Sequence, residues 1–353
     1  MANVFGSKMK LSIFGESHGE AIGIVIDGIK QGVKIDTNLI EFEMQRRAPG
    51  NSQLATPRKE PDKVEIVSGV FNGFTTGAPI CGLIYNTNTK SKDYQNFAPR
   101  PGHADFTARA KFNGFEDYRG GGHFSGRITA PLTFAGAICK QILKEQGIEI
   151  ASHIKNINGV EDEDFSSIDI NLLKSLQKNS FPLLNKDKEK EMVDKILKAK
   201  ENSDSVGGII ECACVGVKAG IGSPFFESIE SKISQMMFSI PAIKGIEFGA
   251  GFNFCNMLGS IANDSFITEN EKIITTTNNN GGINGGITNG MPIVFKVAVK
   301  PTPSIAKTQN TINFETLENT TINIKGRHDP CIVIRALPVV EAGLAICILD
   351  SIL

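Results

Sequence analysis

The stretch Asp117-Tyr-Arg-Gly-Gly-Gly-His-Phe-Ser-Gly-Arg127 runs directly into an aliphatic segment about a third of the way along the chain. Three consecutive glycines expose backbone N–H groups that can bind an anion. We predict a helix over residues 131–146, because that segment begins with a proline and stops before a glycine. Its N-terminal dipole would reinforce an anion site. Two arginines frame the glycines, so we favour anion binding over a flexible loop.

Strand-like runs lie on both sides of this helix at irregular intervals. We predict strands over residues 10–14, 22–27, 64–70, 80–85, 208–217, 292–299 and 321–324. Further helices are expected over residues 185–200, 224–239 and 338–353, the first of them a charged surface helix. The spacing is not that of repeating βαβ units. Neither a dinucleotide GxGxxG turn nor a GxxxxGK[ST] loop is present, which argues against Rossmann and P-loop folds.

One short sequence pattern occurs twice in the chain. Segments 127–136 and 335–343 each place an arginine three or four residues before a proline and then an Ala-Gly pair in an aliphatic helix. A duplicated βα unit with pseudo-two-fold symmetry would explain the match. We interpret so short a match as coincidence.

Composition bounds the class of protein. The 353 residues can form one large domain or two smaller ones, and a net charge of −1 gives no reason to expect nucleic acid or an anionic membrane as partner. Seven cysteines without a CxxC pair, and no signal-peptide pattern, lead us to expect a reducing, cytoplasmic location. The apolar stretch at 336–353 is interrupted by Glu341 and Asp350, so it predicts a core helix and not a membrane span.

Arginine is used sparingly and in two blocks. Lysine is plentiful throughout, but no arginine lies between residues 128 and 326. A chain that uses lysine for plain charge can reserve arginine for planar, bidentate contacts with phosphate or carboxylate. On that interpretation the two blocks converge on one anion site; regional bias remains the alternative. The arginines are Arg46, Arg47, Arg58, Arg100, Arg109, Arg119, Arg127, Arg327 and Arg335.

Two histidines lie in glycine-containing turns. His18 belongs to Gly-Glu-Ser-His-Gly after a predicted strand, and His103 belongs to Pro-Gly-His-Ala-Asp after Arg100. A histidine in such a turn can act as a general acid near neutral pH, although a structural role is the alternative for each. Metal binding is less favoured, because no HxxxH pair or carboxylate triad accompanies them.

Three later segments carry further polar groups. The run Asn278-Asn-Asn-Gly-Gly-Ile-Asn-Gly-Gly286 leads into a strand and then into Lys300-Pro-Thr-Pro-Ser304, where a lysine and hydroxyls can hold a phosphate. In Gly-Arg-His-Asp-Pro at 326–330, Asp329 beside Arg327 should stay ionised; it can position a proton or form an ordinary ion pair.

In this order the pieces resemble the chorismate synthase family. The most specific are Gly-Glu-Ser-His-Gly, Gly-Gly-Gly-x-x-Ser-x-Arg, and Gly-Arg-His-Asp-Pro-Cys followed by Arg335-Ala and Glu341-Ala, and matches extend from residue 14 to 341. The resemblance implies an α+β fold, with residues 1–353 as a single domain whose helical core is sandwiched between antiparallel sheets. It also implies a homotetramer, reduced FMN as cofactor, NADPH as a possible reductant, and elimination of phosphate from 5-enolpyruvylshikimate 3-phosphate.

The same resemblance implies the site residues. The acid–base pair would be His18 and His103, with Ser17, Ser125 and Asp329 near the flavin N5 edge. Flavin contacts would come from His123, Phe124, Ser125, Pro241, Ala242, Gly285, Lys300, Pro301, Thr302, Pro303, Ser304 and Arg327. Arg47 and Gln53 would lie at the NADPH or substrate edge. Substrate anions would be held by Arg46, Arg47, Arg100, Arg127 and Arg335.

The chain departs from the family pattern at several positions. The family usually has Arg-Ser at 123–124, arginine at 48 and 53, asparagine at 241 and serine at 303, where this chain has His-Phe, Ala48, Gln53, Pro241 and Pro303. The losses at 48 and 53 weaken a nicotinamide site. Two rival functions remain open: a flavin oxidoreductase with net hydride transfer, and a non-enzymatic protein that binds a phosphorylated metabolite.

Overall fold

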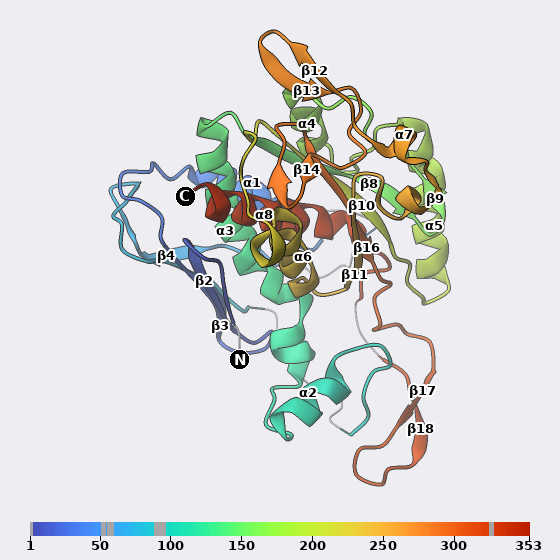
Figure 1. The fold of residues 1–353 in the computed structure, drawn as a ribbon. Coiled ribbons are helices and arrows are strands. Elements are labelled where there is room, and N and C mark those ends of the chain that lie inside the picture. Colours follow the sequence, from blue (N-terminus) through green and yellow to red (C-terminus); the bar gives the residue numbers. More distant parts are fainter. Residues whose placement is uncertain (1–2, 51–53, 55–59, 88–96, 325–327) are drawn as a thin grey trace.

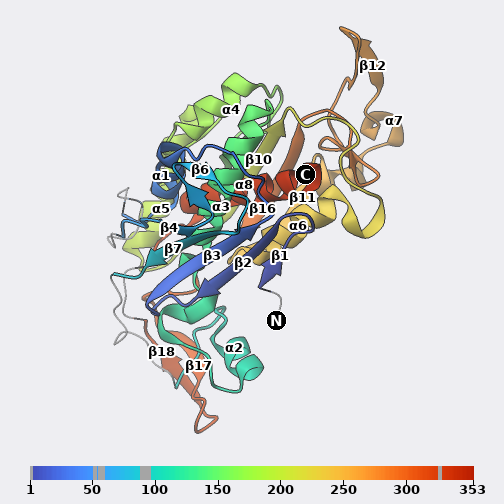
Figure 2. The same cartoon turned by 90° about the vertical axis from the view of Figure 1, so that its left-hand side faces the viewer.

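The computed structural model describes residues 3–50, 54, 60–87, 97–324 and 328–353. Two antiparallel five-stranded sheets enclose a layer of long helices, so the predicted α+β sandwich is confirmed (Figures 1 and 2). In Figure 2 the N-terminal sheet lies toward the viewer, with the C-terminal helix behind it and the second sheet behind that.

The first sheet is built from the N-terminal strands and has the order β1-β2-β3-β7-β4. Its strands are β1 (Val4–Phe5), β2 (Lys10–Gly15), β3 (Ala21–Asp27), β7 (Ile80–Tyr85) and β4 (Glu65–Ser68). Helix α1 (Thr37–Arg47) crosses between β3 and β4, and the side chain of Asp36 caps it by accepting from two backbone N–H groups. Helix α3 (Thr129–Glu145) follows β7 and is buried along most of its length.

The second sheet has the order β11-β16-β10-β8-β9. Its strands are β11 (Ile243–Phe248), β16 (Ile293–Val299), β10 (Gly208–Val215), β8 (Glu149–Ile157) and β9 (Val160–Glu161). Helix α6 (Ile229–Ser239) lies between β10 and β11, and helix α8 (Val333–Ile352) follows β16. Nearly all of α8 is buried, as the predicted core helix requires.

The two halves repeat one topology. Each runs strand, strand, helix, strand, strand, helix, and in each sheet the four main strands are arranged in the order 1-2-4-3. Helices α3 and α8 pack together where their Ala-Gly pairs meet, because a Cβ added at Gly136 would lie 2.1 Å from the Cβ of Ala342. The interpretation of the repeated sequence pattern as coincidence was therefore wrong: the short shared pattern marks the close contact of two equivalent helices.

Smaller helices and strands lie outside the two sheets and the helical layer. They are α2 (Asp105–Phe112), α4 (Ile170–Gln177), α5 (Glu189–Glu201), α7 (Gly259–Ala262) and the short strands β5 (Val70–Phe71), β6 (Phe74–Thr75), β12 (Phe266–Glu269), β13 (Lys272–Thr275), β14 (Ile283–Asn284), β15 (Ile287–Thr288), β17 (Gln309–Ile312) and β18 (Asn319–Ile322). Helix α2 and the β17–β18 hairpin form a smaller lower part of the molecule (Figure 1), joined by Arg109 stacked on the ring of Phe314.

Two helices begin at other residues than the prolines that we took as their first positions. The last helix begins at Val333, and Pro338 lies inside it, although we predicted a start at 338. Pro338 is the sixth residue of α8, so the helix loses one backbone hydrogen bond, to the carbonyl of Ile334, and burial of α8 in the core outweighs that cost. The predicted helix at 224–239 is a short 3-10 turn followed by α6, which Ser228 caps. Among the described residues, no helix is both long and apolar enough to cross a membrane.

Candidate active site

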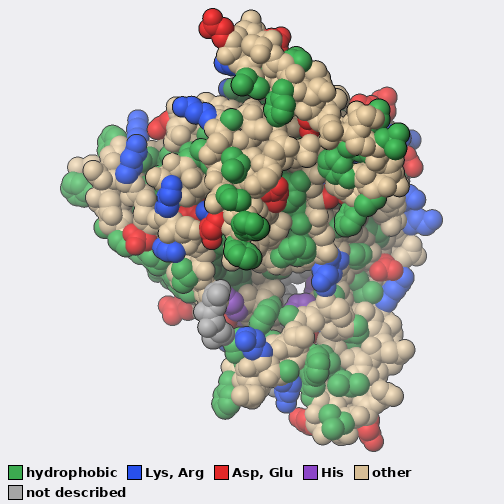
Figure 3. Space-filling model, in the orientation of Figure 1, with side chains coloured by type: hydrophobic (Ala, Val, Ile, Leu, Met, Phe, Trp, Pro, Cys, Tyr) green, Lys and Arg blue, Asp and Glu red, His purple; other side chains and the backbone are tan. Residues whose placement is uncertain are grey.

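A cavity of about 830 Å³ lies between the main body and the lower part that carries α2. Figure 3 shows the molecule hollowed there, with histidine side chains visible at the rim. Its walls come from segments far apart in sequence: the β1–β2 region, the end of α1, residues 100–104 and 120–132, the end of α6, residues 300–304 and the start of α8. The cavity is therefore a product of tertiary structure.

The glycine run lies between the two histidine turns. A Cβ at Gly120 would fall 2.6 Å from Nε2 of His18, and a Cβ at Gly121 would fall 3.2 Å from Nε2 of His103. Both glycines also have positive φ, a conformation that favours residues without a side chain. The backbone N–H of Ser17 donates to the carbonyl of Gly122 and ties the first turn to the run. Only glycine allows both imidazoles to approach this segment so closely.

The turn that carries His103 is held by one carboxylate. Asp105 Oδ1 lies 2.6 Å from His103 Nδ1 and accepts from Arg100 Nη2 at 2.7 Å. Asp105 Oδ2 accepts from Arg100 Nε at 2.8 Å. Burial alone would raise the pKa of Asp105, but hydrogen bonds from Arg100 and His103 lower it well below its usual range. Arg100 also donates to Ser304 Oγ at 3.2 Å, which joins this turn to the 300–304 segment.

A second group of charges lies beside the start of α3. Arg47 and Arg127 both donate to the buried carboxylate of Asp62, and Arg127 is also paired with Glu60. Burial would raise the pKa of Asp62, but the charges of the two arginines lower it. Arg47 donates to Thr129 Oγ1 at 3.3 Å as well. The carboxylates fix the directions of the two guanidinium groups. Arg47 Nη2 also donates to the carbonyl of Gly126, and Arg127 Nη2 donates to that of Tyr85.

Arg335 on α8 completes the ring of cations. It is paired with Asp329, and its Nε donates to the carbonyl of Arg47 at 3.0 Å. The structure thus brings Arg47, Arg100, Arg127 and Arg335 to one cavity, from both arginine blocks of the sequence. Each of the four also has a carboxylate partner, which the sequence did not indicate.

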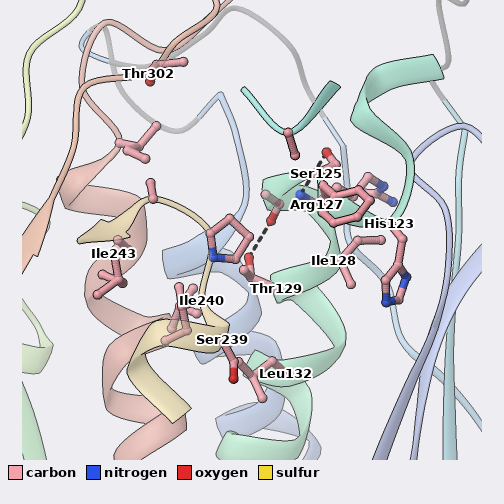
Figure 4. A pocket seen from close by; sticks show the side chains of 18 of the residues that line it. His123, Ser125, Arg127, Ile128, Thr129, Leu132, Ser239, Ile240, Ile243 and Thr302 are labelled. Atoms are coloured by element: carbon pink, nitrogen blue, oxygen red, sulfur yellow. Dashed lines mark hydrogen bonds between the residues drawn. The ribbon is translucent and has the colours of Figure 1, made fainter. Parts of the chain in front are cut away.

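The floor of the cavity is apolar. Ile128, Leu132, Ile240, Ile243 and Val339 line it, and Figure 4 shows Thr302 on the side opposite Leu132. The buried Oγ1 of Thr302 has no hydrogen-bond partner in the part of the chain that the structure describes. An unpaired buried hydroxyl facing a cavity is a plausible ligand contact, because leaving it unpaired is costly.

Most residues singled out in the sequence line this cavity. They are His18, Arg47, Arg100, His103, His123, Phe124, Ser125, Arg127, Pro241, Ala242, Lys300, Thr302, Pro303, Ser304, Asp329 and Arg335. His123 replaces a usual arginine, and its Nδ1 donates to the carbonyl of Gly15 at 2.8 Å, so its ring is anchored to the end of β2. Phe124 lies beside Phe112 of α2 at a ring-centroid distance of 6.1 Å.

Other expected contacts lie elsewhere. Arg46 points away from the cavity into a buried cluster with Glu43 and Glu341, which gives it a structural role in place of the expected substrate contact. Gly285 lies in the exposed turn between β14 and β15, and neither it nor Pro301 is among the cavity-lining residues. Ser17 is buried with its Oγ beside Gly120, and it is not among the cavity-lining residues. Gln53 and Arg327 lie outside the described residues.

Sequence reasoning missed the carboxylates that orient the arginines. Glu60 and Asp62 carry no local motif, and their role depends on contacts with residues about 65 positions away. Asp105 was part of a quoted motif, and its spacing two residues after His103 was the available signal.

Comparison with known proteins decides the family. The family model described as chorismate synthase matches residues 9–353. The chain belongs to the chorismate synthase family. A chorismate synthase from Dehalococcoides mccartyi is 46% identical over 99% of this chain and 96% of its own length. One from Methanobrevibacter smithii is 45% identical over the same shares of the two chains. A solved structure titled "Crystal Structure of Chorismate Synthase" aligns with a TM-score of 0.76 at 30% identity, covering 98% of this chain and 92% of that one.

Chorismate synthases are carbon–oxygen lyases of the shikimate pathway, and the family is known to need reduced flavin. They eliminate phosphate from 5-enolpyruvylshikimate 3-phosphate to give chorismate, the last common step toward the aromatic amino acids. Membership in the family makes this chain an enzyme that acts on that small molecule.

Proposed function

We propose that the cavity binds reduced FMN together with 5-enolpyruvylshikimate 3-phosphate, and that its histidines and arginines carry out the redox-neutral elimination of phosphate. The observation that supports this best is the convergence of two histidine turns, the glycine run and four arginines on one cavity. A substrate with two carboxylates and a phosphate needs several oriented cations, and a leaving phosphate needs an acid.

The residues present fit a flavin. The apolar floor suits a planar ring system, and the unpaired Oγ1 of Thr302 offers a hydrogen-bonding group on the opposite wall. Phe124, Ser125, Pro241, Ala242, Lys300 and Ser304 would hold the cofactor, with His123 in place of the usual arginine. The cofactor's chemistry there would be to lend an electron to the substrate as phosphate leaves and to take back that electron together with the hydrogen that the elimination removes.

The arginines bind and orient the substrate. Each guanidinium has five N–H donors, and the acceptors in the described part of the chain engage two to four of them in Arg47, Arg127 and Arg335. The clamps from Asp62, Asp105 and Asp329 hold these donors in place before the substrate arrives. Pre-oriented cations lose little entropy on binding and stabilise charge that develops on the leaving phosphate. We propose Arg47, Arg100, Arg127 and Arg335 for this role.

The histidines handle protons. His18 is only 8% exposed and lies against the glycine run, where it can donate a proton to the leaving phosphate. His103, on the other side of that run, holds or delivers a proton at the cofactor edge. Asp329, Ser17 and Ser125 would assist proton movement near the N5 edge of the flavin, and His103 would act near N1.

One assay separates this function from its rivals. Pure protein is mixed anaerobically with FMN, dithionite and 5-enolpyruvylshikimate 3-phosphate, and chorismate and phosphate are measured together with the flavin spectrum. We expect many turnovers with no net flavin oxidation. Flavin oxidised once per product would favour the oxidoreductase, and binding without turnover would favour a metabolite-binding protein. His18→Ala and His103→Ala should each lower turnover by about two to four orders of magnitude; near-normal activity in either variant would remove that histidine from the mechanism.

We also propose that the protein uses NADPH poorly as its only reductant. Ala48 and Gln53 replace basic residues that the family usually has, so attraction for the extra phosphate of NADPH should be weak. The enzyme should turn over well with chemically reduced FMN and poorly with NADPH alone. Robust aerobic turnover with NADPH would contradict this point and leave the elimination reaction intact.

The remaining proposals concern the state of the protein. We propose a single domain over residues 1–353, a homotetramer, and a cytoplasmic location without nucleic-acid or membrane partners. Exposed apolar side chains, such as Phe252 at 80% and, on the β12–β13 hairpin, Phe266 at 68%, support self-association. Light scattering on the purified chain tests the tetramer, and a monomer at micromolar concentration would refute it.

A further inference from the structure

We propose that Asp105 is a positioning residue that keeps the neutral imidazole of His103 in its Nδ1–H tautomer, so that Nε2 exchanges the proton. This proposal rests on the proposed catalytic use of His103. Asp105 itself does not line the cavity, so it would act through the imidazole ring of His103, which does.

Local structure explains why one carboxylate reaches both partners. Residues 100–103 form a turn closed by the N–H of His103 donating to the carbonyl of Arg100. Pro101 followed by Gly102 with positive φ is the pattern of a type II turn. Asp105 is the first residue of α2, directly beyond that turn. The tight turn therefore brings the side chains of Arg100 and His103 to the same carboxylate.

Four donors fix the orientation of this carboxylate. Arg100 donates to Oδ2 through its backbone N at 2.9 Å and Nε at 2.8 Å, and to Oδ1 through Nη2 at 2.7 Å. The fourth contact is His103 Nδ1 to Oδ1 at 2.6 Å. A carboxylate with so many cationic contacts cannot rotate freely, and it stays ionised because those contacts hold the pKa of Asp105 far down.

The short Nδ1 contact decides the tautomer. An ionised carboxylate only accepts, so a 2.6 Å contact requires a proton on Nδ1. Arg100 Nη2 also lies 3.0 Å from Nδ1, but guanidinium only donates and already has Asp105 Oδ1 as its nearer acceptor. If Nδ1 lacked its proton, lone pairs of nitrogen and oxygen would face each other at hydrogen-bonding distance. The neutral ring must therefore carry its lone pair on Nε2.

The Nε2 edge faces the glycine run. A Cβ at Gly121 would come within 3.0 Å of Cε1 and 3.2 Å of Nε2, and His103 lines the cavity. The absence of a side chain at Gly121 leaves that edge open to a bound molecule. Asp105 thus sets which nitrogen is free, and the glycine run sets where that nitrogen can reach.

Replacing Asp105 by asparagine should reverse the tautomer. An amide has one acceptor and one donor atom, so it cannot accept from four donors. An NH₂ group at the Oδ2 position would oppose two Arg100 donors, the backbone N–H and Nε, whereas at the Oδ1 position it opposes one, Nη2, and also faces the imidazole. We therefore expect the NH₂ group at the Oδ1 position. The amide then donates to Nδ1, and the ring moves its proton to Nε2. Glutamate at this position retains an acceptor and should keep the original tautomer.

The test uses the full-length protein labelled with ¹⁵N-histidine, which contains five histidines. Imidazole ¹⁵N shifts report the tautomer, and the signals of His103 are assigned as those missing from a His103→Gln variant. We expect Nδ1–H in the neutral ring of the wild type and of Asp105→Glu, and Nε2–H in Asp105→Asn. In the chorismate assay, Asp105→Asn should lose about 10²–10³-fold in kcat with KM within about threefold, and Asp105→Glu should recover part of that loss.

Asp204→Asn is the matched control. Asp204 accepts from Lys307 Nζ at 2.7 Å and from the backbone N of Ser205 at 2.8 Å, and none of these three residues lines the cavity. This variant should keep the His103 tautomer and near wild-type kcat. An Nε2–H tautomer in the wild type would overturn the proposal, as would Asp105→Asn with unchanged tautomer and kcat. If the wild type made no chorismate, the proposed function would fail, but the ¹⁵N comparison would still decide the tautomer.

Discussion

Glu341 should be among the residues whose loss costs this protein most stability. Its carboxylate is completely buried and accepts from Arg46 at 2.6 and 2.8 Å, from Lys140 at 2.5 Å, and from the hydroxyl of Ser152 at 2.7 Å. Glu43 neutralises the second cation through its own contacts with Arg46 and Lys140. The cluster therefore joins α1, α3, α8 and β8 through two cations and two carboxylates.

Glu341→Gln removes one negative charge without a change of size. It leaves two buried cations with one carboxylate, and breaking a buried pair in this way costs about 3–5 kcal/mol. With an unfolding entropy of about 2.1 cal/mol/K per residue, that loss lowers the Tm of a chain of 353 residues by about 4–7 °C. Thermal unfolding at neutral pH, followed by circular dichroism, measures the shift.

A charge-balanced variant separates electrostatics from packing. Glu341→Gln combined with Lys140→Met leaves one cation and one carboxylate, so the double variant should be more stable than Glu341→Gln alone.

The pH dependence of stability gives a second check. Burial would raise the pKa of Glu341, but Arg46 and Lys140 lower it. This stability is therefore present above the ordinary glutamate pKa of about 4.3 and is lost as the pH falls below it. A Tm within 1 °C of the wild type, or fully additive losses in the double variant, would refute the reasoning.

Three further predictions follow from the structure. Arg127→Lys and Arg335→Lys should lose nearly as much kcat/KM as the alanine variants, because lysine cannot reproduce a planar donor set held by a carboxylate; wild-type kinetics in both would contradict bidentate binding. Gly120→Ala should strain a backbone with positive φ and push on the ring of His18, so steady-state kinetics should show a lower kcat, and an unchanged kcat would argue against the close approach. His153 lies between Asp162 and Glu211; burial would lower the pKa of His153, but these carboxylates raise it. The resulting stability is present below about pH 6.5 and is lost as the pH rises through the higher folded-state pKa, so Tm should fall between pH 6 and 9 more in the wild type than in His153→Gln, and parallel profiles would rule this out.

The sequence by itself determined the family, the elements with a clean pattern and most members of the site. The strand at 80–85 and the helix near 131–146 were predicted within two residues, because each has a strong periodic or capping signal. The ordered motifs identified two histidines and four arginines that the structure brings to one cavity. These residues could be predicted from the sequence, because they lie in or beside short local motifs of glycines and turn residues.

Strand β8 shows why other elements were missed. It is buried along most of its length, yet it contains Glu149, Ser152, His153 and Lys155, which break any apolar pattern. Ser152 donates to Glu341, and both nitrogens of His153 face carboxylates. Polar residues can be buried only when such partners exist, and those partners come from distant parts of the chain.

Adjacent arginines give the clearest case of what only tertiary structure decided. Arg46 and Arg47 are indistinguishable in the sequence, and both were expected to contact the substrate. In helix α1 consecutive side chains point about 100° apart, so Arg46 faces Glu341 in the core cluster while Arg47 faces Asp62 and the cavity. Which of the two is available to a ligand depends on where the carboxylates of α8 and of the segment before β4 come to rest, and that is set by the packing of the two halves.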